Sequence, residues 1–269
     1  MIIRHKLACW KKIANSALSV KELSEEELRE GDEVKNEEEK ITLLESAKLL
    51  FANKFYMMIC GTYMLQQIYQ AMINIGLYYM IYILLDENLF PAFSWAINIP
   101  LIIALVITPT LVEKWGGMYK LNLAGFVVAV VGRALVAVAA YMGSVPLMLA
   151  FTALAAFGTC PWQGDMNAVI ASCSEYTYLT KGKRIDGAMY SCTSFGVKVG
   201  GGLGTALTGW MLAFSGFDGK AAVQPESCIE MLKFMYLILP VIIMVVITFI
   251  MSKMNVEKTN AELLAEKFN

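Results

Sequence analysis

The sequence predicts an all-α membrane protein in which six helices cross the bilayer. Hydrophobic residues make up 57% of the 269 positions, the mean hydropathy is +0.55, and charged residues make up only 17%. In an ordinary soluble domain charged residues reach about a quarter of the chain. Residues 1–54 alone hold ten Lys/Arg and eleven Asp/Glu, which leaves a charge-poor remainder. That remainder is long enough for several membrane spans.

Residues 1–40 form a polar segment, which we expect to be solvated and cytoplasmic because runs of charge seldom build a core. Two Ser-x-x-Glu patterns, beginning at Ser19 and Ser24, fit a helix capping box but have no long apolar face behind them. From Ile41 to Phe51 apolar residues recur at helical spacing. Residues 41–54 are therefore predicted to form an amphipathic helix at the membrane surface.

Six apolar runs between residues 55 and 252 form the predicted membrane domain. Each is near the roughly 20 residues needed to cross about 30 Å of hydrocarbon. Charged or turn-forming residues separate the runs, among them Asp86, Gly143 and the polar turn Glu175–Gly187. The predicted spans are Phe55–Leu84, Ala92–Val112, Leu121–Met142, Pro146–Ser172, Ala188–Phe214 and Phe234–Met251.

Lysine and arginine fall almost entirely on one side of this topology. If the N-terminus is cytoplasmic, the cytoplasmic segments hold eighteen of them, and the opposite side holds two, Lys220 and Lys233. The positive-inside rule therefore predicts that both termini are cytoplasmic, with residues 253–269 as a cytoplasmic tail.

The residue inventory argues against an enzyme and against a nucleic-acid-binding protein. Six cysteines are scattered without a C-x-x-C pair, so neither a zinc site nor a disulfide framework is indicated. The single histidine, His5, lies in the polar leader, and no catalytic triad or phosphate-cradling loop occurs. Acidic residues balance the basic ones locally, which disfavours a nucleic-acid partner. We expect no catalytic residue, no metal site and no organic cofactor.

Three charged residues remain inside the predicted spans: Arg133, Asp165 and Lys198. A charge in hydrocarbon costs about 2.5–3.5 kcal/mol on insertion scales, so such residues usually face a cavity and mark an ion or substrate route. Arg133, beside Gly132, has an alternative role in packing alone. For Asp165 and Lys198 we favour function, and a pairing between the two is a further hypothesis.

The fifth span carries a second pattern around Lys198. Gly196, Gly200 and Gly204 fall four residues apart, which is typical of close helix packing but also suits helices that slide during transport. Tyr190, Ser194 and Lys198 share one helix face.

In the fourth span Trp162 and Asp165 share a face as well. An aromatic plate with several hydrogen-bonding groups is what a sugar needs, although many tryptophans only pack.

The polar turn and its flanks resemble the glycoside-pentoside-hexuronide:cation symporters, a branch of the major facilitator superfamily. The similarity covers nearly all of residues 41–252. The residues that carry it are Tyr176, Lys181–Arg184, Asp186–Gly187, Tyr190–Ser191, Lys198, Asn74–Tyr79 and Pro109–Gly116.

The resemblance implies half of a major facilitator fold, built as a 3+3 inverted repeat, and transport of a sugar or glycoside coupled to Na⁺ or H⁺. Lys198 is then expected to link the cation and sugar sites. Trp162, Asp165, Ser194 and Tyr190 are expected to bind the sugar. The cytoplasmic side is expected to be gated by Glu175, Lys181, Lys183, Arg184 and Asp186, unless the basic residues of this group only set the orientation.

A complete member of that family has two six-helix halves, and this chain resembles the central loop and the second half. The resemblance therefore implies a partner half in the cell membrane. The alternative is a membrane scaffold or sensor that retains half of the fold without transporting. The sequence leaves the sugar and the coupling cation open.

Overall fold

The computed structural model describes residues 43–221 and 223–268. The polar segment predicted for residues 1–40 lies outside the described residues. The chain divides into two compact units, 1–46 and 47–269, and the packing described below lies within the second.

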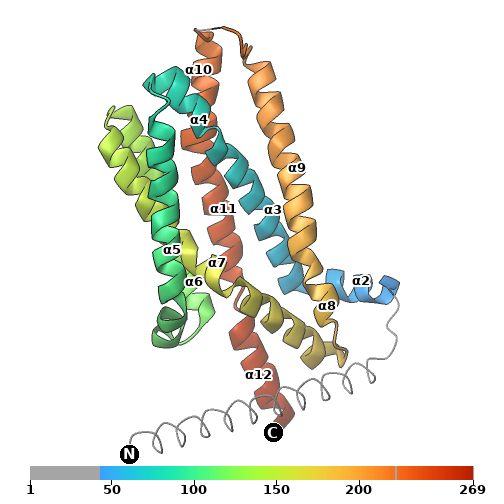
Figure 1. Cartoon of the computed structure of the whole chain (residues 1–269). Coiled ribbons are helices and arrows are strands. Elements are labelled where there is room, and N and C mark those ends of the chain that lie inside the picture. Colours follow the sequence, from blue (N-terminus) through green and yellow to red (C-terminus); the bar gives the residue numbers. More distant parts are fainter. Residues whose placement is uncertain (1–42, 222, 269) are drawn as a thin grey trace, which may run out of the picture. The chain divides into compact units, whose positions relative to one another are not determined.

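Within the described ranges the chain consists of helices that are joined by turns and loops (Figure 1). Helix α2 falls inside the range predicted for the surface helix. The π-helical turns η1 and η2 lie within the first and last predicted spans. The elements are α2 (Leu43–Ala52), α3 (Lys54–Asn74), α4 (Gly76–Tyr79), η1 (Met80–Leu84), α5 (Leu89–Trp115), α6 (Met118–Tyr141), α7 (Val145–Lys181), α8 (Asp186–Met189), α9 (Ser191–Phe214), α10 (Glu226–Lys233), η2 (Phe234–Ile238), α11 (Leu239–Lys253) and α12 (Val256–Phe268).

Four helical stretches of the described residues are long and apolar enough to cross a membrane: Leu89–Trp115, Met118–Tyr141, Val145–Lys181 and Glu226–Lys267. The chain is therefore a polytopic membrane protein, but six spans are not established. Helices α3 and α9 have 21 and 24 residues, which suffices in length. They are less apolar because α3 carries three glutamines and α9 carries Lys198 among glycines and hydroxyl residues.

The helices of the second unit pack in two groups that α11 joins. Helix α7 packs against both α5 and α6, and α3 packs against α9. Helix α11 contacts α3 on one side and α6 on the other, as its place in the middle of the bundle in Figure 1 shows.

The C-terminal part of α7 also reaches the start of α3. The buried Asn53 side chain donates to the Cys173 carbonyl and to Thr177 Oγ1.

Glycines bring the backbones of α6 and α7 into direct contact. A Cβ atom built on Gly125 lies 2.4 Å from the carbonyl oxygen of Gly158, and one built on Gly132 lies 2.7 Å from the backbone nitrogen of Ala155. Real Cβ atoms do not approach that closely, so a side chain at either position forces the helices apart. Pro161 follows in α7, where its missing N–H and its ring interrupt the regular helical hydrogen bonds.

The glycine pattern of α9 is also a packing surface. Gly196, Gly200 and Gly204 are buried, and Cβ atoms built on them meet Tyr63, Met64 and Ala71 of α3 at 2.4–2.9 Å. The packing interpretation of these glycines is therefore confirmed. Gly201 and Gly202 have open space instead.

One local structure differs from the sequence prediction. The polar stretch expected as a turn from Glu175 is helical as far as Lys181, where α7 ends, and the following Gly182 has a left-handed φ of +69°. Thr180 supports the extra turn because its hydroxyl donates to the Tyr176 carbonyl. The predicted tail is also helical, as α12.

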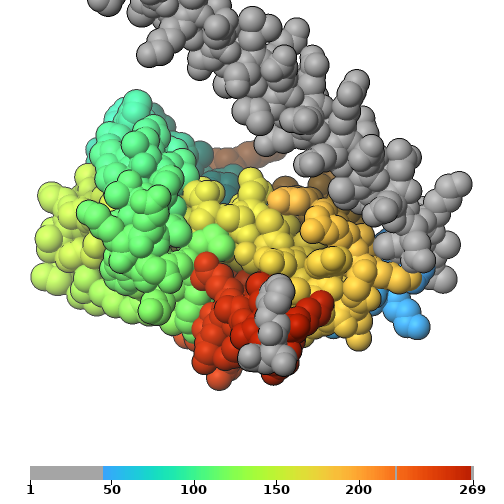
Figure 2. Space-filling view, turned by 90° about the horizontal axis from the view of Figure 1, so that it is seen from below, coloured from blue at the N-terminus to red at the C-terminus, as the bar shows by residue number. Residues whose placement is uncertain are grey.

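Helix α12 supplies the cap for the N-terminus of α6. The Glu257 carboxylate accepts hydrogen bonds from the backbone N–H groups of Met118 and Tyr119 at 3.0 and 2.9 Å. These N–H groups have no partner within α6, and a carboxylate also offsets the positive end of the helix dipole. Gly117 leaves room for this carboxylate, because a Cβ there lies 2.9 Å from Glu257 Oε2. Figure 2 shows α12 in red at the surface of this end, beside the green of α5 and α6.

Replacement of Gly200 by leucine tests the contact between α3 and α9. We expect Gly200→Leu to lower the free energy of unfolding by about 1–3 kcal/mol, because the side chain meets the backbone of Met64. Thermal unfolding in detergent measures the change. The matched control is Gly201→Leu on the open face, and an equal loss in both variants contradicts the assignment of faces.

Replacement of Glu257 by alanine tests the cap. The change removes the acceptor of two α6 N–H groups and should cost about 1–2 kcal/mol of unfolding free energy. Glu262→Ala is the control, because Glu262 is exposed and forms only a long pair with Lys258, at 3.6 Å, whose loss costs about 0.5 kcal/mol or less. A Glu257→Ala variant as stable as the control disproves the capping role.

Candidate functional site

Ser194 and Lys198 lie exposed along one face of α9, as their spacing predicts. Tyr190, the residue before α9, is also exposed, and its hydroxyl donates to the Asn167 carbonyl of α7 at 3.3 Å. Gly201 and Thr205 continue this polar face. It points away from α3, because successive helix residues are about 100° apart and Lys198 is two positions from Gly196. Within the described residues Lys198 has no ion pair or hydrogen bond.

Trp162 and Asp165 lie elsewhere, in the contact between α6 and α7. Trp162 is 1% exposed, and its ring centroid lies 6.0 Å from that of Phe126. Asp165 is 7% exposed, and both of its carboxylate oxygens accept from the Asn122 amide, at 3.0 and 2.9 Å. Both side chains therefore face the neighbouring helix rather than the exposed face of α9.

The structure thus does not bring the five predicted substrate-binding residues together. The suggested pairing of Asp165 with Lys198 is not formed, because Asp165 bonds Asn122 and Lys198 lies on the outer face of α9. Sequence spacing gave the correct shared face within each helix. It carried no information on which neighbour each face meets.

Most of the predicted gating residues lie at the exposed end of α7 and the turn that follows. Glu175, Lys181, Arg184 and Asp186 are exposed. The Arg184 guanidinium lies 4.9 Å from the centroid of the Tyr178 ring, and the Lys267 amine of α12 lies 5.9 Å from it.

Lys183 is half-buried, and the Ser174 hydroxyl donates to Asp186. The contacts of Tyr178 with Arg184 and Lys267, together with this hydrogen bond, join the end of α7 to the turn that follows it and to α12.

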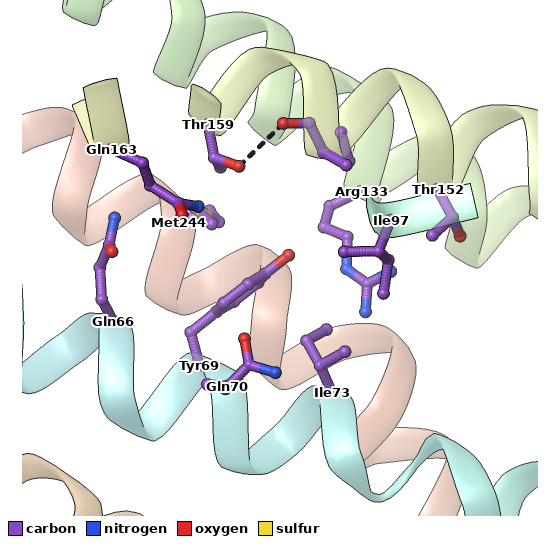
Figure 3. Close-up of a pocket in the computed structure, with 12 residues that line it drawn as sticks. Gln66, Tyr69, Gln70, Ile73, Ile97, Arg133, Thr152, Thr159, Gln163 and Met244 are labelled. Atoms are coloured by element: carbon purple, nitrogen blue, oxygen red, sulfur yellow. Dashed lines mark hydrogen bonds between the residues drawn. The ribbon is translucent and has the colours of Figure 1, made fainter. Parts of the chain in front are cut away.

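A pocket lies between α3, α5, α6, α7 and α11, with a cavity volume of about 80 Å³. Its polar lining consists of Gln66, Tyr69, Gln70, Arg133, Thr152, Thr159 and Gln163 (Figure 3). A second hollow adjoins it and shares Gln70, Thr159 and Gln163 with it. The two together form a polar recess inside the membrane domain.

Sequence reasoning singled out Arg133 but missed the other polar residues of this recess. Gln66, Tyr69 and Gln70 of α3 all line it. Their spacing of three and four residues, within an otherwise apolar span, is the signal that predicts a shared polar face.

The family follows from comparison with known proteins. Residues 16–258 match the family described as MFS/sugar transport protein. The chain belongs to this family. The prediction of a transporter rather than an enzyme is confirmed, as is the resemblance to the symporter branch of the major facilitator superfamily. This member of the MFS/sugar transport family is a multi-pass membrane protein.

Several curated relatives carry names of symporters or transporters. The chain is 25% identical to the isoprimeverose transporter of Lactiplantibacillus pentosus over 173 residues, 64% of this chain and 36% of that protein. It is 28% identical to the uncharacterized symporter YnaJ of Bacillus subtilis over 159 residues, 59% of this chain and 34% of that protein. It is 30% identical to the putative glycoside/cation symporter YagG of Escherichia coli over 69 residues, 26% of this chain and 15% of that protein. The chain thus spans about a third or less of these relatives.

A double-mutant cycle tests whether Asn122 and Asp165 act as a pair. Asn122→Ala leaves a buried carboxylate without its donor and should cost about 1–3 kcal/mol of unfolding free energy. Asp165→Ala in that background should cost little more, because the unpaired charge is gone. Thermal unfolding of the four proteins gives the coupling energy, and additive losses contradict the pairing.

Proposed function

We propose that this protein transports a sugar or glycoside in symport with Na⁺ or H⁺, as the second half of a two-half transporter. Family membership and the similarity to YagG, named as a putative glycoside/cation symporter, support this function. The observation that carries it is the polar face of α9 with Lys198, which is exposed and has no ion pair or hydrogen bond with any residue that the structure describes. An amine in the middle of a span is tolerated only where it meets water or a polar partner.

The partner is a first six-helix half that covers the polar face of α9. Substrate sites in such transporters lie near the midplane, between the two repeats. Tyr190, Ser194 and Lys198 then form one wall of the site, with Lys198 linking cation and sugar. In the same assembly the recess beside α3 is a second wall, since its glutamines offer amide donors and acceptors to sugar hydroxyls.

Trp162 and Asp165 act in this proposal through the packing of α6 against α7, which holds the α7 residues of the recess in place. The charged end formed by Glu175, Lys181, Lys183, Arg184 and Asp186 serves as the cytoplasmic gate. Because the basic residues gather on that side, we place both termini in the cytoplasm and the protein in the cell membrane.

Uptake tests the proposal. The chain is co-expressed with the first half of the isoprimeverose transporter, and accumulation of a panel of labelled neutral and acidic sugars is followed with and without a Na⁺ or H⁺ gradient. We expect cation-dependent accumulation of at least one sugar. Lys198→Met should abolish it, because the variant removes the charge that links the two sites.

The control is Lys220→Met, an exposed lysine in the loop after α9, which should leave uptake unchanged. A Lys198→Met variant with full cation-dependent uptake disproves the coupling role. If no sugar accumulates although both halves reach the membrane, the non-transporting scaffold or sensor replaces transport as the function.

A further inference from the structure

Two cysteines that lie far apart in the sequence meet where α3 packs against α9. Cys60 of α3 and Cys192 of α9 are both free, they are 6% and 0% exposed, and their thiols are in hydrogen-bond contact. Neither belongs to a C-x-x-C pair, so only the helix packing brings the two sulfur atoms together. Two adjacent thiols can form a disulfide bond, which a single buried cysteine cannot.

Helices α3 and α9 run in the same direction, both starting at the end of the bundle at which α8 lies (Figure 1). At that end the hydroxyls of Tyr56 and Ser191 are 3.1 Å apart. Further along, a Cβ atom built on Gly196 lies 3.6 Å from the carbonyl oxygen of Cys60, so the two backbones are in contact there. Cys192 is one turn before Gly196, and Cβ bonds in a helix tilt toward its N-terminus. The Cys60 side chain is therefore directed from the level of Gly196 toward that of Cys192.

The close approach of these helices suits the geometry of a disulfide bond. A disulfide needs Cα atoms about 4.4–6.8 Å apart, and small residues let two helices approach that closely. Gly196 and Gly200 supply the contact, since Cβ atoms built on them meet α3 at 2.4 and 2.8 Å. Because the glycines already hold the backbones together, rotation of the cysteine side chains suffices to bring the sulfur atoms to bonding distance.

The thiol pair is linked by hydrogen bonds to an exposed residue. The Tyr56 hydroxyl is hydrogen-bonded to the Cys60 sulfur and to the Ser191 hydroxyl. Ser191 is exposed at the start of α9, and Cys192 follows it directly. The pair therefore lies within one helical turn of the surface, and a small uncharged oxidant such as hydrogen peroxide has a short path to it.

We propose that Cys60 and Cys192 are a redox modification site, which hydrogen peroxide converts to a disulfide bond between α3 and α9. In the first step the Cys60 sulfur attacks one peroxide oxygen, the O–O bond breaks, and a sulfenic acid and a water molecule form. In the second step the Cys192 sulfur attacks the sulfenic sulfur, the S–O bond breaks, and a second water molecule leaves. The thiols lose two electrons and two protons, and peroxide takes up both. A thiol reductant reverses the reaction.

Thiol counting on the full chain in detergent tests the proposal. After exposure to hydrogen peroxide the protein is denatured, and its free thiols are labelled with a maleimide-linked polymer, which lowers gel mobility once for each thiol. We expect the oxidised protein to carry two labels fewer than protein treated with dithiothreitol, and to remain a monomer on a non-reducing gel. Cys60→Ala and Cys192→Ala should each abolish this paired loss, because either variant leaves one thiol without its partner.

Cys228→Ala and Cys173→Ala are the matched controls, and both should still lose two labels. Cys228 is a buried free cysteine of α10, outside the contact between α3 and α9. Cys173 of α7 is also buried and free, and it lies near Cys192. Thermal unfolding of the reduced proteins shows whether each variant is folded. If Cys60→Ala is not folded, mass-spectrometric mapping of the bond in the oxidised unaltered chain carries the test.

Four outcomes overturn the proposal: oxidised protein that keeps all its labels, loss of a single label, a paired loss that persists in Cys60→Ala and Cys192→Ala, or a bond mapped to another cysteine or to a second copy of the chain. The measurement requires neither a partner half nor a cation gradient. Its failure therefore leaves the transport proposal untouched, and failure of the uptake experiment leaves the thiol pair untouched.

Discussion

Direct backbone contact between helices at glycine residues is the constraint on which the rest of this structure depends. In a membrane, helices gain little from burying apolar surface against each other, so association relies on close packing and polar contacts. Gly125, Gly132 and Gly158 allow that contact between α6 and α7, and Gly196, Gly200 and Gly204 allow it between α3 and α9. These two contacts set the rotation of each helix about its own axis. They decide which side chains remain available for other partners.

The rotation of α9 has a direct functional consequence. Because its glycine face is against α3, the polar face with Lys198 is on the opposite side and stays uncovered in the described part of the chain. The rotation of α6 has a matching effect, since Gly132 packs on Ala155 and the adjacent Arg133 is directed between Tyr69 and Tyr236. The protein therefore presents two cationic sites in its membrane domain, one exposed and one recessed.

The C-terminal helix α12 joins the N-terminus of α6 to the C-terminal part of α7. Glu257 caps α6, and the Asn260 amide donates to the Ser172 carbonyl of α7. Lys267 lies over the same Tyr178 ring as Arg184, so α12 also reaches the turn after α7. These contacts of α12 are polar, so water can replace them if this end of the helices separates.

The sequence by itself determined the class of this protein, since composition, apolar runs and the residues of the polar turn identified a helical membrane protein of a known sugar-transport family. It also predicted which residues share a face within one helix, because that follows from a fixed 100° per residue. Only the tertiary structure decided what each face meets. Trp162 and Asp165 share a face that packs on α6, while Ser194 and Lys198 share one that stays exposed in the described part of the chain. The recess at Arg133 combines residues of five helices, and no local pattern holds that information, because helix rotation and neighbour choice come from contacts between segments far apart in the chain.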